Sequence, residues 1–182
     1  SPDQCASRGT TIVHLPAELY PAIEKARSAG TNKTVLLEQL LVGDEYSVET
    51  IIVDGITHNL NIVKRMFVEQ GGVPIETGHI NPAPLPPLLE KRLYALAKAT
   101  AKALGVNWGV FKIDALVVDK KTPMVLEATA RLSGGYDSSH TTPLSSGRDL
   151  IKMCLRHACG MGFDVEEKKP KTGFTAVSYS PI

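Results

Sequence analysis

The sequence predicts an α+β fold whose strands pair in antiparallel hairpins. Residues 45–53 alternate between apolar and polar, and Asp54-Gly55, a strong signal for a tight hairpin turn, leads from them into the run 57–68. Residues 112–131 read as two further strands joined by a short turn. Because the strands come in hairpins rather than alternating regularly with helices, we expect mixed or antiparallel sheets with flanking helices.

The first part of the chain predicts one helix and one buried strand before the hairpins. Residues 10–15 form a short β-rich run, and Pro16 suits the first position of a helix that extends to about residue 28. Residues 33–41 read as a mostly buried strand, which Gly43-Asp44 interrupts.

The later part of the chain predicts two helices separated by the second hairpin. Apolar residues at helical spacing predict a long helix over about 87–104, capped by Gly105; they are Leu89, Leu93, Leu96, Ala97, Ala101 and Leu104. The remaining elements are a loop over 71–87, a Gly/Ser/Thr-rich loop over 133–146, a helix over 148–158 and a closing strand over 173–180.

Composition limits the class of protein. At 182 residues the chain suits one domain or two small lobes. The net charge of +1 lacks the basic footprint of nucleic-acid binding, and no apolar run approaches the roughly 20 residues that span a membrane. Three cysteines without metal-type spacing, and no recognisable signal peptide, indicate a cytoplasmic protein. We therefore expect small-molecule partners, with a homodimer as an open possibility.

The second hairpin carries the most informative charge pattern. With an even-residue loop centred on Lys120-Lys121, Asp114 lies opposite Glu127 and Lys112 lies opposite Thr129. Side chains alternate between the faces of a strand, so these four residues and Arg131 project from one side. The other side is apolar and consists of Phe111, Ile113, Ala115 and Val117 opposite Leu126, Ala128, Ala130 and Leu132.

Two opposed carboxylates predict a cation between them. Their Cβ atoms lie roughly 4.5–5.5 Å apart, which is destabilising without a counter-ion. Oxygen ligands suit a hard ion such as Mg²⁺, which commonly shares phosphate oxygens. Lys112 and Arg131 then flank the anion, so the pattern outlines a nucleoside-triphosphate site. The alternative is a surface hairpin with solvated charges. Against it, Leu116, Val118, Pro123 and Val125 continue the same face as apolar residues.

The order of these parts resembles the ATP-grasp superfamily of ligases. The resemblance rests on the stretch 37–49, which looks like the hinge strand and the strand after it, and on the acidic hairpin. It implies that Glu38, with the backbone of Gln39, Leu40 and Leu41, holds adenine, and that Glu45 binds the ribose. It further implies that Asp114, Glu127 and Thr129 bind Mg²⁺, or alternatively Mn²⁺, and that Lys112 and Arg131 act on the transferred phosphate and the acyl phosphate.

Three departures from the family pattern lead us to expect a fragment truncated at both ends. Thr129 stands where asparagine is usual. Residues 1–9, with Ser7 and Gly9, resemble the phosphate-covering loop. In the family a strand usually precedes this loop, and this sequence has no counterpart of that strand. The family's N-terminal domain has no counterpart. The resemblance implies a part of the small lobe in residues 1–43, a larger metal-binding lobe in 44–160, and a linker with the start of a further segment in 161–182.

Some candidate residues leave two interpretations open. Lys64 either faces the nucleotide or is solvated, and His79 is either a substrate contact or a structural histidine. The loop 133–137 either approaches a ligand with its backbone or only connects two elements.

The resemblance implies an ATP- and Mg²⁺-dependent ligase that activates a carboxylate as an acyl phosphate for attack by an amine or similar nucleophile. The isolated chain is expected to be inactive and to bind Mg²⁺–ATP weakly or not at all. The alternatives are a nucleotide-binding regulatory or inactive fragment without turnover, and a plain metal-binding α+β domain.

Overall fold

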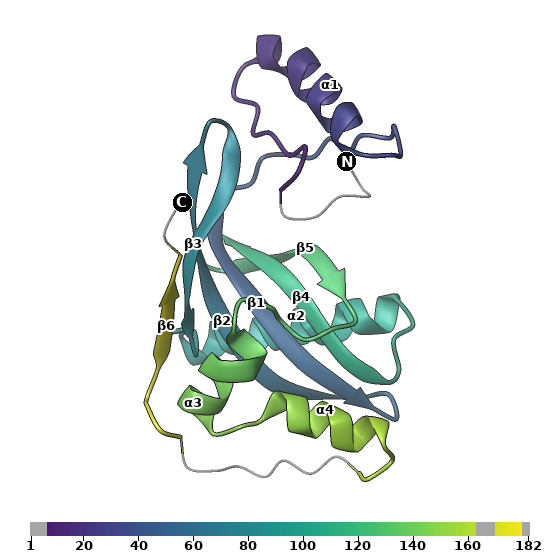
Figure 1. The fold of residues 1–182 in the computed structure, drawn as a ribbon, viewed down its shortest axis with the longest axis vertical. Coiled ribbons are helices and arrows are strands. Elements are labelled where there is room, and N and C mark those ends of the chain that lie inside the picture. The colour runs from purple at the N-terminus through teal and green to yellow at the C-terminus, as the bar shows by residue number, and fades with distance from the viewer. Residues whose placement is uncertain (1–6, 163–169, 180–182) are drawn as a thin grey trace. The chain divides into compact units, whose positions relative to one another are not determined.

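The computed structural model describes residues 7–162 and 170–179, which form six strands and several helices (Figure 1). In chain order these are η1 (Pro16–Glu18), α1 (Leu19–Ala29), β1 (Gly43–Val53), β2 (Ile56–Gln70), β3 (Val73–Asn81), α2 (Pro87–Ala103), β4 (Gly109–Val118), β5 (Thr122–Thr129), η2 (Asp137–Thr141), α3 (Thr142–Ser146), α4 (Leu150–Ala158) and β6 (Thr175–Ser178). The strands form a single sheet in the order β5-β4-β1-β2-β3-β6. None of the helices in these ranges is long and apolar enough to cross a membrane.

The described chain divides into two compact units. Unit 1 contains residues 7–41, 66–77 and 179, and unit 2 contains residues 42–65 and the described part of 78–178. Unit 2 holds the hairpin β4–β5 and the helices α2, α3 and α4. The lobe boundaries expected from the sequence remain a prediction.

The predicted α+β class and antiparallel pairing are confirmed. β1 and β2 form an antiparallel hairpin, and the turn residues Asp54 and Gly55 have φ values of 50° and 77°. Two successive positive φ values suit the twist of a two-residue hairpin, which explains the Asp-Gly sequence. The helix predicted over 87–104 is α2, and the helix predicted over 148–158 begins two residues later as α4, where the Asp149 side chain accepts a hydrogen bond from the Lys152 N–H.

The strand predicted over 33–41 is wrong. This segment has no regular secondary structure, and Leu36, Leu37 and Leu40 are all exposed. An apolar run becomes a strand only where a neighbouring strand takes up its backbone hydrogen bonds, and no described strand pairs with these residues. The β-rich run 10–15 likewise forms no strand, and its Ile12 N–H donates to the Gly72 carbonyl at 2.7 Å.

Two predicted loops contain regular structure. Residues 71–87 include β3, which follows a turn at Gly71 and Gly72 with φ values of 58° and 73° and pairs with β6. Pro74 and Gly78 within β3 weaken its strand signal, so the sequence pattern missed it. Residues 133–146 include the π-helical turn η2 and the short helix α3. Tertiary hydrogen bonds order this segment, as described below.

One face of the sheet packs against α2. The core there contains buried apolar residues of the strands and of the helix: Tyr46, Val48, Ile52, Ile62, Phe111, Ile113, Ala115 and Val117 with Leu89, Leu93, Ala97 and Ala101. We call this the α2 face. Burial of these side chains supplies the main driving force for folding of unit 2.

The opposite face is divided between a smaller core and polar residues. At one end Ile51 and Leu60 pack with Leu150 and Met153 of α4, which lies on the opposite side of the sheet from α2 (Figure 1). Toward the other end, every second residue of β1 and β4 on this face is polar, including Ser47, Glu49, Lys112 and Asp114. We call the whole face opposite α2 the polar face.

Candidate functional site

The acidic hairpin has the pairing that the sequence predicted at its charged end. Asp114 lies opposite Glu127, and Lys112 lies opposite Thr129 in the β4–β5 register. On its other edge β4 pairs with β1, so that Asp114 is also opposite Ser47 and Lys112 is opposite Glu49. Six polar side chains of three neighbouring strands therefore share one face.

The loop that sets this register differs from the prediction. Three residues, Asp119 to Lys121, separate the paired residues Val118 and Thr122, whereas we expected an even number. The register then shifts between Asp114 and Ala115, because Leu126 is an extra residue on β5. The odd loop and the bulge compensate, which restores the pair Asp114–Glu127.

The bulge also changes which side chains share a face. Val125 pairs with Ala115 and Pro123 pairs with Val117, so both lie on the α2 face and not on the polar face as predicted. Leu126, which was predicted to lie on the apolar side of the hairpin, is the extra residue of the bulge and has 48% of its surface exposed. The pattern of alternation therefore holds only as far as the bulge.

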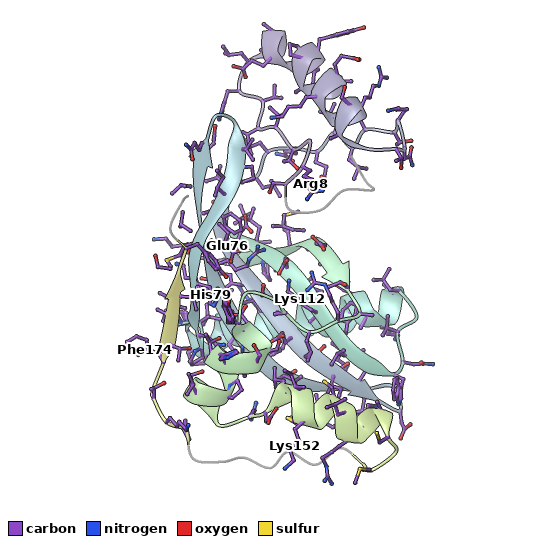
Figure 2. The ribbon with its side chains drawn as sticks, viewed as in Figure 1. Arg8, Glu76, His79, Lys112, Lys152 and Phe174 are labelled. Atoms are coloured by element: carbon purple, nitrogen blue, oxygen red, sulfur yellow. The ribbon has the colours of Figure 1, made fainter. Side chains whose placement is uncertain are left out.

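Asp114 is the best-coordinated carboxylate on the polar face. It is 8% exposed and accepts a 2.6 Å hydrogen bond from the Ser47 hydroxyl. Lys112 Nζ lies 2.8 Å from each of its oxygens, and Arg65 Nη1 lies 3.2 Å from Oδ2. Lys112 itself is 6% exposed and projects from the middle of β4 (Figure 2). A buried carboxylate with two cationic partners marks a site of concentrated charge.

Glu127 complements Asp114 as a candidate metal ligand. Its carboxylate is exposed and has no hydrogen bond or ion pair to any described residue. The two opposed carboxylates and the Thr129 hydroxyl form an all-oxygen donor set, which fits Mg²⁺. The described residues contain no group of three or more His, Cys, Asp or Glu side chains suited to a metal. Mg²⁺ needs none, since it commonly uses one or two carboxylates together with water and phosphate oxygens.

Glu45 lies at the end of the polar face near the start of β1. It pairs with Arg65 of β2 in the register, and Arg65 Nη1 lies 3.7 Å from Glu45 Oε2. Lys64, the residue next to Arg65, projects from the α2 face and pairs with Asp44 at 2.9 Å. This hydrogen bond raises the pKa of Lys64. Lys64 therefore has a carboxylate partner of its own, and Arg65 is the basic residue of β2 on the polar face.

Glu49 is a buried carboxylate that our sequence analysis did not single out. It is 1% exposed, and its Oε1 accepts hydrogen bonds from the Ser133 N–H at 2.8 Å and the Ser138 hydroxyl at 2.6 Å. Its Oε2 is buried and has no hydrogen-bond partner among the described residues. Glu49 thereby ties β1 to the glycine-containing loop that follows Arg131.

Arg131 lies beyond the end of β5 and is exposed. Its Nη1 donates to the Leu132 carbonyl at 3.0 Å. Strand alternation no longer sets the direction of its side chain, so its place on the polar face remains a prediction. The loop after it contains two residues in the left-handed region, Gly135 at φ 61° and Tyr136 at φ 68°.

His79 is part of a buried polar network between β3 and η2 (Figure 2). Its Nε2 lies 2.7 Å from Asp137 Oδ1. Asn81 Nδ2 donates to the hydroxyls of Thr141 and Thr142 at 2.8 Å, and Asn61 Nδ2 donates to Thr142 at the same distance. These contacts order residues 133–146, and they favour the structural interpretation of His79.

The predicted adenine and phosphate segments belong to unit 1. Glu38, Gln39 and Leu40 are exposed and Leu41 is partly buried, all in the segment without regular structure. Gly9 has φ 73°, and a Cβ there would come within 2.7 Å of Ala29 Cβ, so packing against α1 accounts for this glycine. The Ser7 hydroxyl donates to the Pro74 carbonyl at 3.3 Å. Residues 1–6 of the predicted phosphate loop lie outside the described residues.

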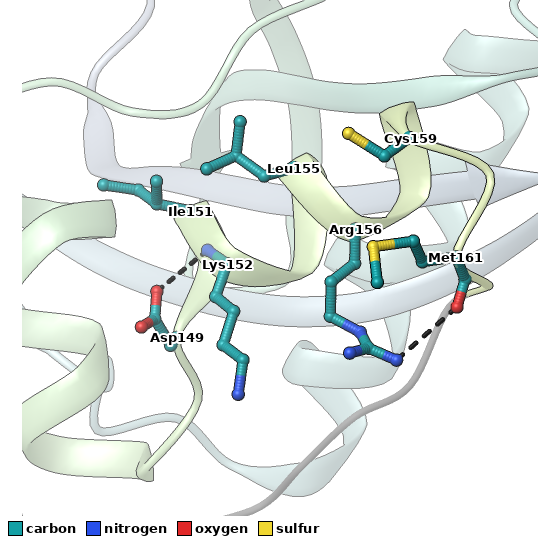
Figure 3. A pocket seen from close by; sticks show the side chains of 7 residues that line it. All are labelled: Asp149, Ile151, Lys152, Leu155, Arg156, Cys159 and Met161. Carbon is teal, nitrogen blue, oxygen red and sulfur yellow. Dashed lines mark hydrogen bonds between the residues drawn. The ribbon is translucent and has the colours of Figure 1, made fainter.

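A pocket lies against α4, away from all of these residues (Figure 3). Its lining is largely apolar and consists of Asp149, Ile151, Lys152, Leu155, Arg156, Cys159 and Met161. It contains none of the predicted site residues.

The sequence analysis missed Ser47, Glu49 and Arg65. A usable signal existed, because Glu45, Ser47 and Glu49 alternate with Tyr46 and Val48 along β1. A strand with polar residues at every second position and a buried partner strand on each side presents a polar face inside the protein. The sequence did not show that β1 lies between β2 and β4 in the sheet, which is what brings these polar side chains together.

Comparisons with known proteins identify the family of this chain. The chain matches a family model described as an ATP-grasp domain over residues 3–140. A search of curated protein sequences gives no match.

Similar solved structures include the L-amino acid ligase of Bacillus licheniformis, which is 25% identical with a TM-score of 0.69, over 80% of this chain and 35% of that one. The biotin carboxylase of Campylobacter jejuni, solved as a β,γ-ATP complex, is 20% identical with a TM-score of 0.72, over 90% of this chain and 36% of that one.

A third similar structure is the biotin carboxylase domain of the Hydrogenobacter thermophilus 2-oxoglutarate carboxylase, a dimer in complex with MgADP, ADP and bicarbonate. It is 16% identical with a TM-score of 0.66, over 88% of this chain and 35% of that one. The chain thus spans about a third of the length of these proteins. Since the family model covers most of the chain and these ligases share its fold, the chain belongs to the ATP-grasp family.

Proposed function

We propose that this chain is the nucleotide- and metal-binding part of an ATP-dependent ligase that joins a carboxylate to an amine. The observation that carries the proposal is the pair Asp114–Glu127 beside the buried Lys112, in a chain of the ATP-grasp family. The similarity to an L-amino acid ligase supports amino acids as the first substrates to test.

The proposed reaction has two steps. A carboxylate oxygen of the first substrate attacks the γ-phosphorus of ATP, the bond to the β-phosphate oxygen breaks, and ADP leaves. The amine of the second substrate then attacks the acyl carbon, loses a proton and displaces inorganic phosphate. The protein contributes by positioning the groups and neutralising their charge, and no covalent intermediate with the chain is needed.

The residues of the polar face have distinct roles in this proposal. Asp114 and Glu127, with Thr129 as a hydroxyl donor, would hold Mg²⁺, which neutralises phosphate charge when bound. The Lys112 ammonium and the Arg131 guanidinium stabilise negative charge on the transferred phosphoryl group and the acyl phosphate. The carboxylate of Glu45 accepts hydrogen bonds from the ribose hydroxyls. Glu38 and the backbone of residues 39–41 hold adenine.

The test is ADP release by the purified full-length protein with Mg²⁺–ATP and pairs of L-amino acids. Glu127→Gln keeps the shape of the side chain but removes its charge. It should reduce amino-acid-dependent ADP release about a hundredfold or more, because metal electrostatics supply several kcal/mol of transition-state stabilisation. Glu90→Gln is the matched control, since Glu90 is an exposed carboxylate in the first turn of α2. A rate close to wild type in Glu127→Gln would contradict the metal assignment.

A further inference from the structure

Arg65 occupies a position between two carboxylates that the proposed function assigns to different parts of one ligand. It projects from β2 on the polar face, opposite Glu45 of β1, and its side chain is 20% exposed. Its Nη1 reaches across β1 to lie 3.2 Å from Asp114 Oδ2 on β4, while remaining 3.7 Å from Glu45 Oε2. One guanidinium therefore bridges the predicted ribose carboxylate and the predicted metal carboxylate.

The ion pair with Asp114 is not required to neutralise that carboxylate. Lys112 Nζ already lies 2.8 Å from both of its oxygens, and the Ser47 hydroxyl donates a further hydrogen bond. A second cation at a single, mostly buried carboxylate adds the cost of removing another charge from water and gains little attraction in return. The placement of Arg65 is better explained by a second anion that binds at the same point.

We propose that Arg65 binds the phosphate groups of the nucleotide, and that a phosphate replaces Asp114 as its partner when the nucleotide is bound. This inference rests on the proposed function. A ligand that contacts Glu45 with its ribose and reaches Asp114 with its metal-bound end must pass Arg65, and the part of a nucleotide between these ends is its phosphate chain. A planar guanidinium can grip a phosphate through two parallel hydrogen bonds, and its partial exposure leaves it accessible.

The neighbouring residue provides a matched control. Lys64 carries the same charge on the same strand, but it projects from the opposite face and pairs with Asp44. Replacing either residue with glutamine removes one positive charge from β2. A general electrostatic effect of net charge should appear in both variants, whereas a direct contact should appear in one.

The experiment measures dissociation constants of ADP and of adenosine by calorimetry on the full-length wild-type protein, Arg65→Gln, Arg65→Lys and Lys64→Gln. Arg65→Gln should bind ADP about tenfold to a hundredfold more weakly, as expected for the loss of hydrogen bonds between charged groups. Adenosine, which has no phosphate, should bind within twofold of wild type. Arg65→Lys should show a smaller loss for ADP, and Lys64→Gln should bind both ligands as the wild type does.

Each other outcome overturns the inference in a recognisable way. If Arg65→Gln weakens adenosine and ADP equally, the residue only maintains the shape of the site. If Arg65→Gln binds ADP as well as wild type or better, Arg65 is merely a competing counter-ion of Asp114. Either result leaves the proposed function intact. A wild-type protein that binds neither ligand would overturn the proposed function and the inference together. Should Arg65→Gln fail to fold, Arg65→Lys, which keeps the charge, decides by the same comparison.

Discussion

The two faces of β4 carry side chains of opposite character, although alternate residues of one ten-residue strand supply both. On the α2 face Phe111, Ile113 and Ala115 are buried against apolar residues of the helix. On the polar face Lys112 and Asp114 are nearly as well buried, at 6% and 8% exposure. Burial is therefore not what distinguishes the two faces.

The difference lies in what each face contributes. Apolar burial on the α2 face stabilises the fold, whereas a buried ion pair is weak evidence for stability because desolvation offsets the attraction. We therefore expect the charges of Lys112 and Asp114 to serve the binding and chemistry of the proposed function. If so, substitutions on the two faces should separate stability from activity.

The largest expected effect is on stability and comes from the α2 face. Leu93 is fully buried in α2, so Leu93→Ala should lower the free energy of unfolding by about 2–5 kcal/mol. Activity per folded molecule should stay unchanged, because Leu93 lies on the face opposite the predicted site. Urea denaturation followed by circular dichroism measures the first quantity, and ADP release corrected for the folded fraction measures the second.

Leu104→Ala is the control for this prediction, since Leu104 ends the same helix with 61% of its surface exposed. Its effect on stability should lie within about 0.5 kcal/mol. The comparison of the two faces breaks if Leu93→Ala lowers turnover of the folded protein as strongly as it lowers stability.

A smaller effect, on activity alone, is expected at Arg131. Arg131→Lys keeps the charge but loses the planar guanidinium that can hold an oxyanion through two hydrogen bonds. The rate of substrate-dependent ADP release should fall roughly tenfold to a thousandfold, on the order of the loss of one oriented donor. The dissociation constant of ATP and the free energy of unfolding should change little.

Arg27→Lys, at an exposed pair with Glu24 on α1, is the matched control and should have no effect. If Arg131→Lys instead greatly weakens ATP binding while turnover at saturating ATP survives, Arg131 anchors the nucleotide. Its assignment to the acyl phosphate is then wrong.

The smallest expected effect is on the reactivity of the Cys154 thiol. Cys154 belongs to α4 and packs against the smaller apolar core at one end of the polar face. Burial, and secondly the charge of Glu49, raises the pKa of the Cys154 thiol from 9.0 to about 11. At pH 8 the thiolate fraction is then about a hundredfold lower, which a roughly tenfold greater nucleophilicity of the more basic thiolate partly offsets. Cys154 should react with a disulfide reagent about tenfold more slowly than an unperturbed thiol.

The exposed Cys159 provides the internal comparison, with Cys5 replaced by serine in every variant. Removing Cys159 should eliminate the fast phase of the reaction and leave the slow one. Equal rates at the two thiols would show that α4 does not shield this end of the polar face.

The residue pattern alone was sufficient for features that depend on near neighbours in the chain. The Asp54-Gly55 turn, the helix α2 and the pair Asp114–Glu127 were all predicted from it. The resemblance to the ATP-grasp superfamily rested on the residues of this hairpin and of the stretch 37–49, and the family match confirms it. The turn and the helix succeed because turn chemistry and the periodicity of side chains are local properties. The pair Asp114–Glu127 is found as predicted because the three-residue loop and the bulge at Leu126 compensate each other.

Features that depend on distant residues were not predictable in the same way. The bulge at Leu126, the strand β3 and the ordered segment 133–146 each depend on partners elsewhere in the chain. The strand predicted over 33–41 was wrong because a partner is missing. Its apolar composition suggests a strand, but no described strand pairs with it.

The contacts among the charged side chains show most clearly the difference between local and distant features. The sequence by itself determined that an acid pair, a lysine and an arginine occur near one hairpin. Only the tertiary structure decided that Asp114 is shared among Lys112, Ser47 and Arg65, because β1 lies between β2 and β4 in the sheet. Strand order is set by the packing of whole elements against one another, and residues 65 and 114 carry no local signal of their contact.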